Sequence, residues 1–121
     1  MRSIIICVVL FLLCFKVKSQ SVSCSDLYQF IIENGYKKGT IPSYLMNSSW
    51  LNKVTAFSYD YKIYVVAEIK KDEFDFKPKS YIFCGIPSLN WQYFQFGGAG
   101  DSQSYGERFH KYIMDYKCNC K

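Results

Sequence analysis

The sequence has little histidine, no closely paired zinc-ligand cysteines and no apolar run long enough to cross a membrane. His110 is the only histidine, and no two cysteines have the C-x2-C spacing of a zinc knuckle. The longest apolar run falls well short of the about 20 residues that a membrane-spanning helix needs. The chain also contains no internal repeat and no low-complexity segment. These absences argue against a zinc protein, a multi-span membrane protein and a repeat protein.

The N-terminus has the pattern of a secretory signal peptide. Arg2 supplies a positive charge, residues 4–15 form an apolar run of 12 residues, and Val17 and Ser19 have the small-residue spacing of a cleavage site. An uncleaved anchor is the alternative, and the shortness of the run argues against it. We therefore predict a signal peptide over residues 1–19, cleaved after Ser19, and a secreted or periplasmic protein.

Loss of this segment lowers the formal net charge from +5 to +2. Arg2, Lys16 and Lys18 leave with it, so 12 of the 15 basic residues remain against 10 acidic ones, a formal charge of +2. A nearly neutral domain lacks the electrostatic footprint of a nucleic-acid-binding protein. The lysines within residues 70–79 form two pairs with three acidic residues between them, which favours a solvated loop. We expect a protein or a small ligand as partner, no nucleic acid, no cofactor and no membrane span after cleavage.

The remaining cysteines predict a disulfide-bonded domain over residues 20–121. Four of the six cysteines lie in it, namely Cys24, Cys84, Cys118 and Cys120. Four cysteines in a small exported domain are typical of disulfide bonds. A bridge between Cys118 and Cys120 would close a very small ring with unsuitable Cα and Cβ geometry. Each tail cysteine is therefore expected to pair with Cys24 or Cys84, in either of two combinations.

Capping signals and apolar spacing predict three helices, of which the first covers residues 23–34. Ser23 or Ser25 can cap its N-terminus, and Gly35 can close it in a left-handed conformation. The second helix is short and begins at Pro87.

The third helix follows the capping box of residues 104–107, in which the side chain at each end bonds the backbone N–H of the other. Its apolar positions recur at helical spacing and predict a buried stripe. This stripe consists of Phe109, Tyr112, Ile113 and Tyr116. On the opposite side, Glu107 and Lys111 are expected to form an ion pair.

Three strands are predicted between the helices. Residues 50–59 are rich in β-forming residues, residues 61–70 alternate between the two sheet faces, and residues 80–86 form the third strand. Asp60 marks a tight hairpin, whereas residues 36–49 have little regular signal and are expected to be a connection. The predicted fold class is α+β, a three-stranded antiparallel meander packed with an N-terminal helix and two C-terminal helices.

Residues 48–116 resemble the KTSR domain family. The matching residues are Tyr59 and Asp60 at the first hairpin, Tyr81 and Phe83 before Ile86 and Pro87, and Ser104, Gly106, Phe109 and Ile113 in the last helix. The charged loop over residues 71–79 and His110 depart from the family pattern. The resemblance implies a compact α+β module, some members of which are appended to lysyl-tRNA synthetases, and it implies no established reaction. It leaves the first helix and the cysteine-containing tail uncovered.

Aromatic residues supply the candidate binding site. After loss of Phe11 and Phe15, the mature part retains 8 Phe, 11 Tyr and 2 Trp. Such residues dominate interaction hot spots, although large rings also fill small cores efficiently. We expect an exposed aromatic patch on the outer sheet face, or a site near the glycine-rich loop of residues 97–104. The candidate binding residues are Tyr64, Tyr81, Phe83 and Trp91.

The predicted function is a non-catalytic binding or interaction module, without catalytic residues or a metal site. A small secreted hydrolase or nuclease is the alternative, with His110 as general base beside Glu107 or Asp101. No nucleophile is paired with these residues in the sequence. A protein inhibitor is a third interpretation, because small disulfide-bonded exported domains often have that role.

Overall fold

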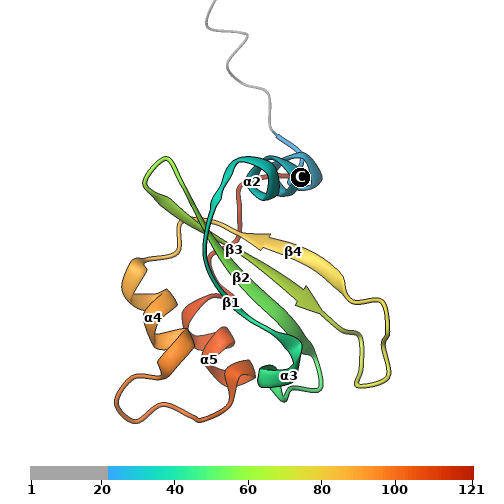
Figure 1. Ribbon diagram of the computed structural model, residues 1–121, viewed down its shortest axis with the longest axis vertical. Coiled ribbons are helices and arrows are strands. Elements are labelled where there is room, and N and C mark those ends of the chain that lie inside the picture. The colour runs from blue at the N-terminus through green and yellow to red at the C-terminus, as the bar shows by residue number, and fades with distance from the viewer. Residues whose placement is uncertain (1–21) are drawn as a thin grey trace, which may run out of the picture.

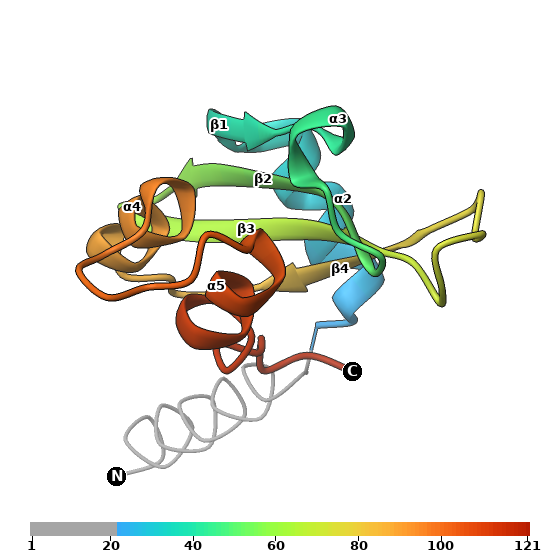
Figure 2. The ribbon, with the colours of Figure 1, turned by 90° about the horizontal axis from the view of Figure 1, so that it is seen from below.

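A computed structural model describes residues 22–121, which form an antiparallel sheet with helices on both faces (Figures 1 and 2). The predicted signal peptide of residues 1–19 and its cleavage site lie outside the described residues. Within them, no helix is long and apolar enough to cross a membrane. The elements are α2 (Cys24–Asn34), β1 (Tyr36–Ile41), α3 (Ser43–Met46), β2 (Leu51–Tyr59), β3 (Lys62–Ile69), β4 (Lys79–Phe83), α4 (Ser88–Phe96) and α5 (Tyr105–Tyr112).

The sheet has four strands in the order β1-β2-β3-β4, and each neighbouring pair is antiparallel. The α+β class is confirmed, but the prediction of three strands is wrong, because residues 36–49 contain β1. A register shift between Lys37 and Gly39 interrupts its pairing with β2, and Ile41 is its one buried residue. An edge strand with a bulge and little burial has no apolar alternation for a sequence pattern to detect.

The predicted hairpin at Asp60 is confirmed. Asp60 and Tyr61 have φ angles of 50° and 62°, and Tyr59 pairs with Lys62 on the other side of the turn. Two central residues with positive φ form a turn whose twist matches that of the flanking strands. The turn fixes the register of β2 and β3, the two central strands.

The two sheet faces have separate hydrophobic clusters, with α4 and α5 on one face and α2 on the other (Figure 2). The larger cluster joins one side of the strands to the two C-terminal helices. Its members include Val54, Ala56, Ile63, Val65, Ala67, Phe83, Trp91, Phe94, Phe109 and Ile113. On the opposite face, Ile31 of α2 packs on Phe57 and Val66. The predicted alternation along β3 is therefore confirmed.

Helix α2 begins as predicted and ends differently. The Ser23 hydroxyl accepts a hydrogen bond from the Asp26 N–H at 3.0 Å, which confirms Ser23 as the N-cap. Gly35 has φ −75° and ψ 150°, so the chain leaves α2 extended and enters β1 directly. The expected left-handed conformation is wrong. The glycine is instead explained by space, since a Cβ there would lie 2.6 Å from the carbonyl oxygen of Ile31.

Only half of the predicted capping box of α5 forms. The Ser104 hydroxyl accepts from the Glu107 N–H at 3.3 Å, but the Ser104 N–H donates to the Ser102 hydroxyl at 3.0 Å. The helix ends at Tyr112, before Tyr116 of the expected stripe. The expected pair of Glu107 with Lys111 is also wrong, because the described chain pairs Lys111 with Asp101.

Candidate functional site

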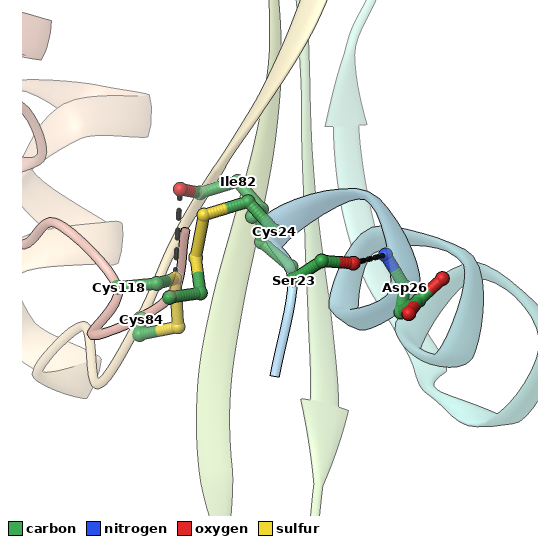
Figure 3. Close-up of a disulfide and its surroundings, with 7 residues drawn as sticks. Ser23, Cys24, Asp26, Ile82, Cys84 and Cys118 are labelled. Atoms are coloured by element: carbon green, nitrogen blue, oxygen red, sulfur yellow. Dashed lines mark hydrogen bonds between the residues drawn. A yellow bond between two sulfur atoms is a disulfide. The ribbon is translucent and has the colours of Figure 1, made fainter. Parts of the chain in front are cut away.

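The C-terminal tail is fixed to the sheet and to α2 by two disulfide bonds (Figure 3). Cys24 pairs with Cys120 and Cys84 pairs with Cys118, with Cα separations of 5.0 and 4.9 Å. The expectation that each tail cysteine pairs with Cys24 or Cys84 is confirmed, and one of the two combinations is selected. The tail therefore passes from the end of β4 to the start of α2, where Figure 1 shows the C-terminus.

Backbone hydrogen bonds support the disulfides at both ends of the tail. The Cys84 N–H donates to the carbonyl oxygen of Tyr116, and the Cys24 N–H donates to that of Lys121, both at 2.8 Å. The Cys118 Sγ lies 3.5 Å from the carbonyl oxygen of Ile82 (Figure 3). Because a disulfide sulfur carries no proton, this approach is a contact rather than a hydrogen bond.

A cavity of about 580 Å³ lies between β4, the tail and the first turns of α2. We call it the β4 groove. Apolar side chains and cystine sulfurs make up most of its lining, and its polar side chains are few. The lining residues are Cys24, Ser25, Tyr28, Ile69, Ser80, Tyr81, Ile82, Phe83, Met114, Lys117, Cys118 and Cys120.

The groove is open because β4 is an edge strand. Within residues 22–121, the tail pairs with β4 through the bridge between Phe83 and Lys117, which leaves residues 79–82 without a second strand partner. The tail then diverges from β4 to reach Cys24. An edge strand that is neither paired nor covered is a site where other molecules can bind.

The groove also joins the two hydrophobic clusters around the edge of the sheet. Ile69 and Met114 border the cluster under α4 and α5, whereas Tyr28 and Ile82 border the cluster under α2. Each of these four side chains is half-buried and lines the groove. The apolar surface of the groove is therefore continuous around the edge of the sheet.

The structure places the four predicted binding residues in different parts of the molecule. Tyr81 lines the groove and is 47% exposed, while Phe83 lines it from the core and is only 5% exposed. Tyr64 belongs to the α2 side of the sheet, and Trp91 is buried under α4. The expected exposed patch of Tyr64, Tyr81 and Phe83 on one outer sheet face is therefore wrong. The Trp91 ring, expected near the glycine-rich loop, is buried rather than available as a surface site.

The pairing register of β4 explains this error. Tyr81 pairs with Ala67 and Phe83 with Val65, which places both rings on the core side. Directly opposed residues of an antiparallel pair share a face. The predicted third strand extends to residue 86, but β4 ends at Phe83 and Gly85 has a φ of 64°. The chain turns there, so Ile86 returns to the core side.

His110 does not form an acid–base pair with Asp101. Its exposed ring packs against Trp50 with a centroid separation of 5.0 Å. The Asp101 carboxylate accepts from Lys111 Nζ and the Tyr112 hydroxyl, both at 2.5 Å, and from the Gly98 N–H at 2.6 Å. These bonds, that from Lys111 above all, lower the pKa of Asp101 to about 2. The described residues contain no group of three or more potential metal ligands.

Hydrogen bonds from Arg108 of α5 hold the glycine-rich loop and the end of α4 in place. The buried Arg108 guanidinium donates to the carbonyl oxygens of Phe94, Ser102 and Gln95 at 2.9, 3.0 and 3.3 Å. It also lies 4.5 Å from the ring centroid of Tyr105. A cation at the C-terminal carbonyls of α4 stabilises that end of the helix. Arg108 and Asp101 therefore fasten the loop of residues 97–104 to α4 and α5.

Tyr28, Ile69, Met114 and Lys117 were not predicted as site residues. They come from three distant segments, which sheet pairing, core packing and the two disulfides bring together. The signal that pointed to this place was the cysteine spacing. No protein-family model, curated protein or solved structure matches the chain. The resemblance to the KTSR domain family therefore stays a prediction.

Proposed function

We propose that this protein is a non-catalytic binding module that takes a small ligand with an apolar body in the β4 groove. The observation that carries the proposal is an open apolar cavity of about 580 Å³ beside an edge strand. Small-molecule sites have volumes of roughly 300–1,000 Å³ and are lined mainly by apolar side chains with few polar groups. The β4 groove matches both the volume and the mainly apolar lining of such sites.

Preorganisation supports the same function. Two disulfides fix the tail against β4 and α2, so the walls of the groove are covalently held in place. A ligand that enters a preformed site loses less free energy to the ordering of side chains and loops. Burial of apolar ligand surface contributes about 25 cal/mol per Å². Because the walls of the groove are already ordered, more of the free energy of apolar burial contributes to affinity.

We further propose that the protein acts outside the cytosol. Disulfide bonds persist in oxidising compartments and are rare where thiols are kept reduced. All four cysteines of the described residues are paired in disulfides. Together with the signal-peptide pattern of residues 1–19, this supports export to the periplasm or the extracellular medium.

The test is binding of N-phenyl-1-naphthylamine, a neutral fluorescent probe for apolar sites, to the oxidised mature domain. The Ser25→Trp variant places a large ring in the groove. Ser88→Trp is the matched control, because Ser88 is also an exposed serine in the first turn of a helix and does not line the groove. We expect saturable binding by the wild type and by Ser88→Trp, and at least about tenfold weaker binding by Ser25→Trp.

The location of the probe is checked by amide chemical shifts. Binding in the groove is expected to move the signals of Tyr81, Ile82 and Met114 and to leave those of Asp60 and Tyr61, in the turn between β2 and β3, in place. Unsaturable binding by the wild type, or equal affinity in both tryptophan variants, contradicts the proposed function.

A further inference from the structure

We propose that the natural ligand of the β4 groove is an amphipathic anion, with a single aliphatic chain in the groove and a carboxylate at Lys117. This inference rests on the proposed function and specifies the chemistry of the ligand. Two features carry it, namely the charge at the groove and the continuity of its apolar surface.

Among the lining residues that belong to the described part of the chain, 22–121, Lys117 is the only charged one. Its side chain is exposed, and the single salt bridge of residues 22–121 joins Lys111 to Asp101, so Lys117 has no carboxylate partner there. Lys70, by contrast, donates its Nζ to the carbonyl oxygen of Ser48 at 3.2 Å. Lys117 is therefore a cation without a counterion beside an apolar cavity. Its charge complements a ligand anion.

Two serine hydroxyls provide further donors at the same cavity. Ser25 of α2 and Ser80 of β4 are exposed, and both line the groove. Hydrogen bonds to a charged group are shorter and stronger than those between neutral groups. An anionic head group can use these hydroxyls together with Lys117, whereas a cationic head group would meet the lysine charge.

The apolar part of the groove fits an extended chain. The surface runs from Met114 and Ile69 around the edge of the sheet to Ile82 and Tyr28. A chain of methylene groups can follow such a bent path because it has many low-energy conformers. Each buried methylene raises affinity by about fourfold. Affinity should therefore rise along a series of hexanoate, octanoate and decanoate.

The test compares three ligands with the same ten-carbon chain length and different heads, with decanoate and decyltrimethylammonium below their micellar concentrations and 1-decanol below its solubility limit. Decanoate, 1-decanol and decyltrimethylammonium are titrated against the probe-loaded wild type, Lys117→Gln and Lys117→Glu. Lys62→Gln is the matched control, since Lys62 is an exposed lysine outside the groove. Amide spectra of each variant verify that the fold is retained.

We expect decanoate to displace the probe at about tenfold lower concentration than decanol from the wild type and from Lys62→Gln, as a charge-assisted contact predicts. This preference for decanoate over decanol should vanish in Lys117→Gln. In Lys117→Glu, decyltrimethylammonium should displace the probe at a lower concentration than decanoate.

Three results overturn the inference, and they are distinguishable from one another. Equal displacement by decanoate and decanol, still blocked by Ser25→Trp, shows that the groove binds apolar chains without a preference for anions. That result leaves the proposed function standing. Absence of saturable binding by all three ligands and by the probe itself shows that the proposed function is wrong. A preference for decanoate that survives in Lys117→Glu also overturns the assignment of Lys117.

Discussion

Cys24 and Cys120 lie 96 positions apart in the sequence and 5.0 Å apart between their Cα atoms. Their disulfide joins the first residue of α2 to the end of the chain, while Cys84–Cys118 closes a shorter loop of 34 positions. Both disulfides link the C-terminal tail, through Cys118 or Cys120, to the rest of the domain. The two bonds therefore build the wall of the groove and hold the two ends of the domain.

Removal of the Cys24–Cys120 disulfide is expected to loosen the chain ends before the central strands. In the Cys24→Ser/Cys120→Ser variant, amide exchange should accelerate in the first turn of α2 and in the tail, because only backbone hydrogen bonds remain there. The free energy of unfolding should fall by about 2–4 kcal/mol through the larger entropy of the unfolded chain. Hydrogen–deuterium exchange with mass spectrometry measures the first effect and urea denaturation the second.

The matched variant for this prediction is Cys84→Ser/Cys118→Ser, which removes the covalent link of the tail to β4 and keeps the link to α2. It should weaken probe binding, since only backbone hydrogen bonds then hold the wall of the groove beside Phe83. Loss of protection in β2 and β3 at the same rate as in the tail, in either variant, would contradict this order of loosening.

Phe109 is expected to be a major contributor to the core. It is fully buried in α5, and its ring meets Phe83, Trp50 and Phe94 at centroid separations of 5.3, 5.8 and 5.9 Å. Phe109→Ala should lower the free energy of unfolding by about 3–5 kcal/mol, the usual cost of a large cavity. The control is Phe96→Ala at a position 77% exposed, where the change should stay within about 0.5 kcal/mol. Equal losses in urea denaturation would show that Phe109 does not have this role.

The Asp101 carboxylate should make stability depend on pH in the acid range. Its pKa in the folded protein is lowered from 3.8 to about 2, mainly by the hydrogen bond from Lys111. A group with a depressed pKa in the folded state stabilises it above the unfolded pKa, and this contribution is lost as the pH falls through the folded pKa. Thermal unfolding of the wild type should therefore lose this stabilisation between about pH 4 and about pH 2.

Asp101→Asn removes the carboxylate and should flatten this part of the pH profile. Asp115→Asn is the control, because Asp115 is an exposed carboxylate outside this hydrogen-bond network. The variant at Asp101 should be less stable than the wild type at neutral pH, and the difference should narrow on acidification. A difference that stays constant over the acid range would rule out a titrating Asp101.

The fold was predictable where its signals are local. The alternation along β3, the turn at Asp60 and the Ser23 N-cap each depend on a few neighbouring residues, and each is confirmed. Strand β1 was missed because its place depends on pairing with β2 across a bulge between Lys37 and Gly39. No neighbouring residue in the sequence carries that information.

The candidate site was less predictable because it is assembled over long range. The four cysteines indicated that the tail returns to the rest of the domain, but not that a groove forms beside it. The faces of Tyr81 and Tyr64 depend on the register between β3 and β4 and on the turn at Gly85. These are properties of the assembled sheet rather than of any single strand.

Gly106 gives a test of packing against helix propensity. It lies in α5, where alanine would ordinarily stabilise a helix by about 1 kcal/mol relative to glycine. A Cβ at this position, however, would lie 2.9 Å from Nε1 of Trp50, inside normal contact distance. The indole also packs against Phe109, so it cannot move away without a disturbance of the core. Gly106→Ala should therefore lower the free energy of unfolding, by about 1–3 kcal/mol as overpacking usually does.

Trp50→Phe provides the matched background, because the smaller ring lacks the nitrogen that a Cβ at Gly106 would meet first. In a double-mutant cycle, Gly106→Ala should cost much less in this background, and the coupling energy between the two positions should be about 1 kcal/mol or more. An equal cost in both backgrounds would mean that contact with Trp50 is not the reason for glycine. A stabilised Gly106→Ala variant would mean that helix propensity outweighs packing at this position of α5.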